Sequence, residues 1–363
     1  MNEEQFRSRI YWVTFLFSML VVWVHSYNGE LFLGLTGQAA VVDRIERAVG
    51  EQLGQMAVPG FFMVSAYLFY RRFTWEKLLY KWKSRVHSVL IPYFLWNFLY
   101  YMAYVLATRI PAITRLIGKT AVPFDGGQLV RAVAFYGYNP VFWYLFQLIL
   151  LIALAPLVWL LMRSNVTAAL TFAALALMIW KGRYFPLLNA DALFYYSAGA
   201  WAALHREREG RFVESGRIGD WAVAAGVLAF LGMAAVLFGR PGMALWQNPL
   251  QTVLIRFVMA SAAWMAVSLA PLPAAFTWMK QNFFLYAIHF ALVRLVNKAG
   301  ALVLGGNAAA ALGIFLVMPA VMAVASYGLS RLLGRFLPGV YGVLSGGRGA
   351  RYSSLHFSSA SKR

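Results

Sequence analysis

Apolar residues in this chain form long continuous runs separated by shorter polar stretches. A membrane-spanning helix needs about 20 predominantly apolar residues. Strands of a membrane barrel would instead alternate apolar and polar positions over short segments, so continuous runs favour helices. The pattern predicts an all-α, polytopic membrane helix bundle of about ten transmembrane helices. They lie near residues 9–27, 52–70, 87–108, 140–162, 165–181, 190–205, 219–239, 250–270, 281–299 and 307–333.

The polar stretches between the runs are too short to form a separate soluble domain. The end of the chain is rich in Gly, Ser and Arg, a composition typical of mobile segments. We therefore predict an integral-membrane domain over residues 1–335 and a flexible cytoplasmic tail over residues 336–363.

The distribution of Lys and Arg indicates an orientation. With the N-terminus in the cytoplasm, the inside segments contain 20 of these residues and the outside segments contain 10. Cytoplasmic loops of membrane proteins carry such an excess of positive charge. We expect both termini inside. Arg7 and Arg9 precede the first run as in a signal peptide, but no small-residue cleavage site follows, so we interpret this run as a retained helix.

Composition supports a membrane protein and excludes some chemistry. The chain is 61% hydrophobic and only 12% charged, with a mean hydropathy of +0.63, which is too little charge to cover a soluble surface. The net charge of +19 would indicate nucleic-acid binding in a soluble protein. Here the cations lie in short loops, so we expect no nucleic-acid partner. The absence of cysteine excludes disulfides, thiolate metal sites and a Cys nucleophile.

His25 is the first candidate catalytic residue. It ends the first apolar run, and an ionisable side chain at membrane depth is costly and usually functional. A neutral imidazole there can accept a proton from a hydroxyl group. The alternative is an interfacial histidine that only anchors the end of the helix.

His289 is the second candidate, within the ninth run. Tyr286 and Asn282 precede it by three and seven residues, so a polar stripe lies on one face of the predicted helix. The stripe either takes part in chemistry or forms a hydrogen bond that holds helices together. The sequence leaves open whether His25 and His289 touch.

A basic stretch at residues 71–86 interleaves cations with aromatic residues. Such a segment can bind a phosphorylated ligand by charge and stacking, or lie on anionic lipid. The candidate ligand-binding cations are Arg71, Arg72, Lys81, Lys83 and Arg85.

Every Asp and Glu lies outside the apolar cores of these runs, so a carboxylate partner for His25 has to come from the outer rim. Glu30, Glu51 and Asp191 are nearest by topology, although each is also compatible with a solvated loop. The lack of acids within the runs argues against an ion-coupled transporter. Arg256 and Arg294 lie inside runs and either bind substrate or extend to the membrane surface. No metal-site spacing occurs, and we expect no metal.

Five landmarks, in order, resemble a known family. They are residues 20–26, an apolar run ending in His25 and Ser; residues 61–69, with Ser65 and Tyr67 among aromatics; Arg85 followed by Pro-Tyr at 92–93; Trp143 in Phe-Trp-Tyr-Leu; and Tyr286-Ala-Ile-His289. Together they resemble acyltransferase family 3, the integral-membrane O-acyltransferases that include polysaccharide O-acetylases.

The resemblance implies an activity. Family members move an acyl group, commonly acetyl from cytoplasmic acetyl-CoA, to a hydroxyl group of an extracytoplasmic glycan, with the first-helix histidine as the catalytic residue. It implies His25 as the catalytic residue. We expect His289, Tyr286 or Glu30 to assist it. Ser65, Tyr67, Trp143, Arg256 and Arg294 are the expected substrate-binding residues. It also implies a multi-pass protein of the inner (plasma) membrane, in contact with lipid and with the envelope polysaccharide synthesis or export machinery.

The chain departs from the family pattern early in the first helix. Many members carry an Asp-Leu-x-Arg-like cluster early in the first helix, whereas residues 12–18 here contain no charge. Two other functions are compatible with the sequence: a transporter of polysaccharide or lipid-linked sugar without acyl-transfer chemistry, and a structural subunit of an envelope synthesis complex.

Overall fold

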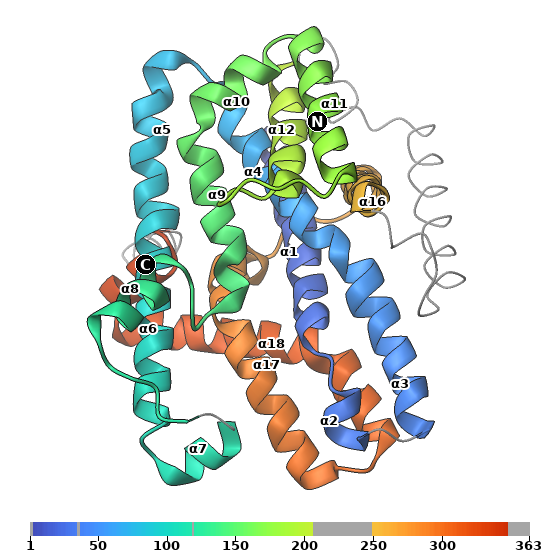
Figure 1. The fold of residues 1–363 in the computed structure, drawn as a ribbon, viewed down its shortest axis with the longest axis vertical. Helices are drawn as coiled ribbons and strands as arrows, with labels where there is room; N and C mark the ends of the chain where they lie inside the picture. The colour runs from blue at the N-terminus through green and yellow to red at the C-terminus, as the bar shows by residue number, and fades with distance from the viewer. Residues whose placement is uncertain (1–2, 35–36, 118–119, 206–248, 348–363) are drawn as a thin grey trace, which may run out of the picture. The chain divides into compact units, whose positions relative to one another are not determined.

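The computed structural model describes residues 3–34, 37–117, 120–205 and 249–347 (Figure 1). All regular secondary structure in these ranges is helical, which confirms the predicted all-α class for the described residues. The chain divides into two compact units, residues 1–73 with 155–328, and residues 74–154 with 329–363.

The first unit contains most of the long helices. Its described α-helices are α1 (Glu3–His25), α2 (Gly29–Leu33), α3 (Gly37–Arg47), α4 (Ala57–Tyr70), α10 (Ala155–Met162), α11 (Asn165–Trp180), α12 (Ala190–Leu204), α16 (Pro249–Leu269), α17 (Asn282–Leu304) and most of α18 (Ala308–Phe336). A π-helical turn (Ala48–Leu53) and a 3-10 turn (Gly54–Met56) connect α3 to α4, and another 3-10 turn (Thr277–Gln281) precedes α17.

The second unit contains the shorter set. Its described α-helices are α5 (Leu78–Arg85), α6 (Ile91–Ala107), α7 (Pro111–Ile117), α8 (Gly126–Ala134), α9 (Trp143–Ala153), the end of α18, and α19 (Pro338–Leu344). Short 3-10 turns (Trp75–Lys77, Pro140–Phe142) and a π-helical turn (Val86–Leu90) complete it.

Six helical stretches of the described chain are long and apolar enough to cross a membrane: Glu3–Leu33, Ala39–Tyr70, Trp75–Ala107, Pro249–Leu269, Thr277–Leu304 and Ala308–Phe336. A seventh is obtained if the pair Pro140–Ala153 and Ala155–Met162, bent by 70°, counts as one span. These apolar helices fit a multi-pass membrane protein.

Two of the predicted spans are helical but short. Helix α11 has 16 residues and α12 has 15, which at 1.5 Å per residue is less than the thickness of a bilayer core. The predicted span at 219–239 lies outside the described residues. The first part of the predicted tail forms α19, where Trp96 donates a hydrogen bond to the Leu344 carbonyl at 3.0 Å.

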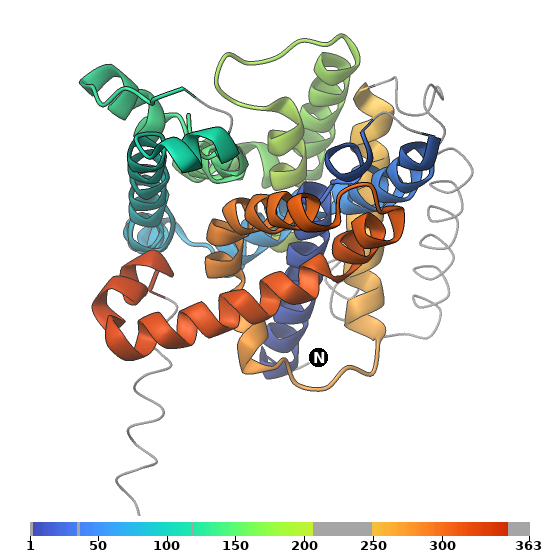
Figure 2. The same cartoon turned by 90° about the horizontal axis from the view of Figure 1, so that it is seen from below.

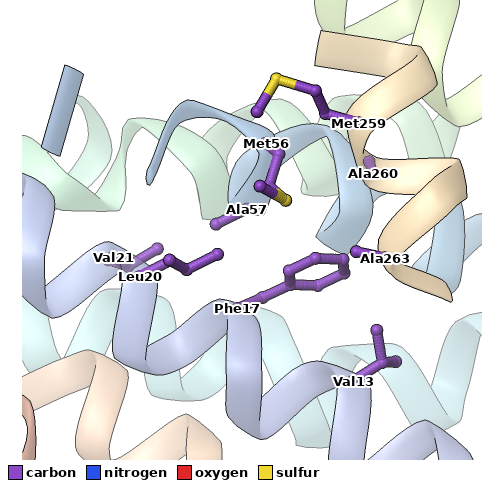
Figure 3. Close-up of a cluster of buried hydrophobic side chains, with 9 residues drawn as sticks. All are labelled: Val13, Phe17, Leu20, Val21, Met56, Ala57, Met259, Ala260 and Ala263. Carbon is purple, nitrogen blue, oxygen red and sulfur yellow. The ribbon is translucent and has the colours of Figure 1, made fainter. Parts of the chain in front are cut away.

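Helix α1 packs against α4 and α16 through an apolar stripe. Val13, Phe17, Leu20 and Val21 are buried at spacings of three, four and seven residues, which places them on one helical face. Figure 3 shows the Phe17 ring pointing across this cluster toward Ala263 of α16. The stripe fixes the helix that ends at His25.

Glycine allows α4 and α12 to approach at backbone distance. A Cβ atom on Gly199 of α12 would lie 2.2 Å from the Met63 carbonyl oxygen of α4. Small residues permit this close packing in membranes, where dispersion contacts rather than water exclusion drive helix association.

Two tryptophans donate to carbonyls that lie four residues before a proline. Pro319 of α18 has no N–H, so the carbonyl of Phe315 lacks its usual helical donor. The Trp23 indole donates to that carbonyl at 3.1 Å. Trp82 likewise donates at 2.8 Å to the carbonyl of Ile152, four residues before Pro156. In lipid, such pairing avoids the cost of a bare carbonyl.

We predict that Gly199→Ala destabilises the protein by about 1–3 kcal/mol, the usual cost of overpacking, because its new methyl meets backbone. Thermal unfolding in detergent, followed by size-exclusion chromatography, measures this. Gly313→Ala is the matched control, because nothing lies within 4 Å of the position and alanine favours helix. Equal stability of the two variants would contradict the packing described.

Candidate functional site

The two candidate histidines meet. The ring centroids of His25 and His289 are 5.3 Å apart, and the Phe290 ring lies 5.4 Å from His25. His25 is the last residue of α1, and His289 lies on the second turn of α17. The sequence did not determine whether these two residues touch. The structure shows their rings in contact, and both residues belong to the first unit.

Helices α1 and α17 pack against each other (Figures 1 and 2), and their contacts follow the same order along both helices. Asn282 of α17 donates to Thr14 of α1 at 2.9 Å. The histidine rings meet farther along both helices. Asn297 then donates to the Ser26 carbonyl at 3.1 Å. The predicted polar stripe on the ninth run therefore faces α1.

The hydrogen bonds of His289 define its tautomer. The residue is 1% exposed, and its Nδ1 lies 2.7 Å from the Tyr286 carbonyl oxygen. A carbonyl only accepts, so Nδ1 carries the proton. Nε2 is buried and has no hydrogen-bond partner within the described chain. It therefore presents a lone pair on the side of the ring that is not bound to backbone.

The His25 ring is half-buried and carries no hydrogen bond to any described residue. Its described contacts are the two aromatic rings of α17. The imidazole is thus positioned by packing, and both of its nitrogens are available to a substrate.

The chain leaves α1 through a buried polar turn. Asn28 donates to the Ala311 carbonyl at 3.1 Å and to Asn297 at 3.4 Å. One carboxylate oxygen of Glu46 accepts from the backbone N–H groups of Asn28 and Gly29, both at 2.9 Å. Glu46 and the two asparagines are almost fully buried. These bonds satisfy the backbone groups next to His25.

Sequence reasoning missed Glu46 and the Asn28–Asn297 pair. Glu46 lies in a polar stretch where a solvated side chain is the usual expectation. A signal was nevertheless available, because an apolar helix that ends at Ser-Tyr-Asn-Gly needs buried acceptors and donors nearby.

None of the carboxylates predicted to partner His25 makes a described hydrogen bond or ion pair with it. Glu30 is exposed on α2, and it makes none of the described contacts of His25. Glu51 pairs with Arg47 at 2.7 Å, and Asp191 interacts electrostatically with Arg256. Tyr286 reaches His289 through its backbone carbonyl, with the two rings 6.0 Å apart.

The predicted phosphate-binding cations fall into both units. Arg71 pairs with Glu3 of α1 at 2.9 Å, lies over the Phe6 ring, and is 12% exposed at its side chain. Arg72 is exposed and lies 3.4 Å from the same carboxylate. Lys81, Lys83 and Arg85 belong to α5 of the second unit.

The predicted substrate-binding residues are also dispersed. Tyr67 lines an apolar cavity of about 940 Å³ enclosed by α1, α4, α11, α12 and α16, and Ser65 is on the same helix, α4. Trp143 begins α9 in the second unit. Arg294 is exposed, 5.5 Å above the Phe290 ring that contacts His25. Within the described residues, no cluster of His, Cys, Asp or Glu is arranged to bind a metal.

Comparison with known proteins identifies the family. Residues 10–327 match the acyltransferase domain of acyltransferase family 3. The chain belongs to acyltransferase family 3. No solved structure matches it.

A curated relative agrees with this family. The chain is 28% identical over 195 residues to the succinoglycan biosynthesis protein ExoH of Rhizobium meliloti (strain 1021). The match covers 51% of this chain and 50% of the relative, so the chain spans about half the length of that protein. The match to an acyltransferase domain favours an enzyme over the transporter and the structural subunit that the sequence left open.

We predict that Asn297→Leu lowers the free energy of unfolding of the acyltransferase by about 1–3 kcal/mol, because buried groups lose their partners. Thermal unfolding in detergent checks this. Leu295→Ala, on the same helix, is the control, because that side chain is 56% exposed. Unchanged stability of Asn297→Leu would show that the turn does not depend on this amide.

Proposed function

We propose that the protein transfers an acyl group, acetyl in the first instance, from cytoplasmic acetyl-CoA to a hydroxyl group of an extracytoplasmic polysaccharide. The contact between His25 and His289 is the observation that carries the proposal. Membership of an acyltransferase family and the ExoH relative support the reaction class and the polysaccharide acceptor. In this proposal ten spans place both termini in the cytoplasm of an inner-membrane protein that works beside the envelope polysaccharide machinery.

His25 is the general base. Its unpaired nitrogen takes the proton of the acceptor hydroxyl as the oxygen attacks the thioester carbonyl. The carbon–sulfur bond then breaks, coenzyme A leaves as thiolate, and the imidazolium returns the proton to sulfur. The products are an ester and free coenzyme A, so atoms and charges balance.

His289 supports this cycle. Because its Nδ1 proton is committed to the Tyr286 carbonyl, Nε2 can only accept while the ring is neutral. An acceptor on a ring whose centroid is 5.3 Å from that of His25 favours a protonated His25 over a neutral one, which stabilises the charge that develops in the transition state.

The donor binds through charge. The positive side chains of Lys81, Lys83 and Arg85 on α5 attract the phosphates of coenzyme A. Arg71 and Arg72 of the first unit are weaker candidates for the same role. The ion pairs of Arg71 and Arg72 with Glu3 weaken their share, so α5 provides the main contribution.

We expect His25→Ala to reduce acyl transfer by about 10²–10⁴-fold, the usual contribution of a general base. His289→Gln, which retains an acceptor, is expected to lose less than His289→Leu. The assay incubates proteoliposomes with labelled acetyl-CoA and glycan extracted from the source envelope. Thioester hydrolysis is followed in parallel, so that a wrong acceptor is distinguished from an inactive enzyme.

Folding of each histidine variant is checked by its elution as a monodisperse peak. If the folded His25→Ala protein kept wild-type transfer and hydrolysis, the proposed mechanism would be wrong.

The double variant Lys83→Gln/Arg85→Gln is expected to raise KM for acetyl-CoA by about tenfold, equivalent to about 1.4 kcal/mol of lost donor binding, with kcat unchanged. Steady-state kinetics measure this. Arg335→Gln, an exposed cation near the end of α18, is the control. An equal KM for acetyl-CoA in both variants would show that α5 does not bind the donor.

A further inference from the structure

A second cavity lies in the other unit, apart from the histidines. It has a volume of about 650 Å³ and is formed around the end of α8 and the turn that follows. Five of the residues lining it carry the argument: Gln128, Arg131, Phe135, Tyr136 and Tyr138. A volume in this range is typical of small-ligand sites.

The backbone turn that forms this cavity is specifically held. The N–H of Gly137 bonds back to the Arg131 carbonyl at 3.2 Å, which closes the end of α8. Tyr136 has φ = +47°, a left-handed conformation that is uncommon for a bulky residue and has an energetic cost. The Tyr93 hydroxyl bonds to the Ala134 carbonyl at 2.9 Å, which helps to fix this conformation.

The turn presents aromatic rings to the cavity. Phe135 is 50% exposed, and both it and Tyr136 rest against Phe146, at 6.1 and 5.5 Å between ring centroids. Tyr138 packs against Tyr101 at 5.2 Å. Each of these rings therefore packs against another aromatic ring and also lines the cavity.

Polar donors stand beside the rings. Arg131 is exposed, and no described residue forms a hydrogen bond or ion pair with its guanidinium. The Gln128 side-chain oxygen accepts from Tyr138 at 3.4 Å, which leaves the Gln128 amide N–H₂ free of described partners. A fork of cationic donors matches a carboxylate.

In the proposed ten-span topology, the segment that forms this cavity follows the third crossing. Three spans precede it, Glu3–Leu33, Ala39–Tyr70 and Trp75–Ala107. Each crossing changes side, so residues after Ala107 are on the side reached by the end of the first span. In the proposed function this is the side of the acceptor.

We propose that this cavity binds the acceptor glycan through a sugar that carries a carboxylate. The flat C–H faces of a pyranose pack on the aromatic rings, and Arg131 and Gln128 bind the carboxylate and a hydroxyl group. This inference rests on the proposed function and names the chemical class of its acceptor. An anionic lipid headgroup has the charge but no stacking face, so the three supported rings favour the sugar.

The test combines a variant with an altered acceptor. Arg131→Gln is expected to raise KM for the extracted glycan by about tenfold, with kcat and donor hydrolysis unchanged. Reducing the glycan carboxyls to alcohols, with carbodiimide and borohydride, should raise the KM of the wild-type enzyme to the same extent. The KM of Arg131→Gln should change little on the reduced glycan. Arg183→Gln, an exposed cation in the loop before α12, is the control.

A wild-type KM for Arg131→Gln, or an equal further loss on the reduced glycan, overturns the proposal. Phe135→Ser adds a second variant: a rise in KM for both glycan forms supports stacking, and no rise contradicts it.

Binding of labelled glycan to nanodiscs tests the site when no acyl transfer is observed, so that failure of the proposed function is distinguishable. Nanodiscs of phosphatidylcholine are compared with nanodiscs that contain phosphatidylglycerol. Glycan binding that depends on Arg131 in both lipids supports the proposal. If Arg131→Gln alters only the retention of phosphatidylglycerol, the cavity is a lipid site and the proposal fails.

Discussion

The ending of α1 is the constraint on which the site depends. A helix that stops at membrane depth exposes backbone groups that lipid cannot satisfy. Glu46 accepts two of the N–H groups that follow His25, and Asn297 donates to the carbonyl of Ser26. The same amide sits on the helix that carries His289, two turns farther along. The bonds that satisfy the turn therefore also set the distance between the two imidazoles.

This arrangement separates two tasks. Packing holds the His25 ring and leaves its nitrogens free of described partners, whereas backbone hydrogen bonding fixes the orientation of His289. A proton acceptor needs an open nitrogen, and its supporting group needs a defined tautomer. Helix α1 itself is anchored on its other face, where Phe17 enters the cluster with α4 and α16. The end of the helix that carries His25 is thus held by packing, and the His25 ring remains half-buried.

Much of this could be predicted from the sequence, because apolar runs and an isolated histidine within them are local signals. Nine of the ten predicted runs contain helices in the described chain, and the remaining run, residues 219–239, lies outside it. The tertiary contacts could not be predicted. The spacing along one helix does not reveal which face of another it meets, so the contact between His25 and His289 stayed open. Glu46 was missed because an acid in a polar stretch is expected to be solvated, whereas this one is buried. The basic stretch at residues 71–86 likewise gave no indication that Arg71 would pair with Glu3.

The indole of Trp23 has a consequence for how this chain can diverge. Its bond to the carbonyl of Phe315 exists because Pro319 supplies no amide proton. If the proline alone were exchanged, the helix would reclaim the carbonyl and the indole would lose its partner. If the tryptophan alone were exchanged, an unpaired oxygen would face hydrocarbon. Evolution should therefore change the two positions together, and their covariation across homologues would record a contact between segments that are distant in the sequence.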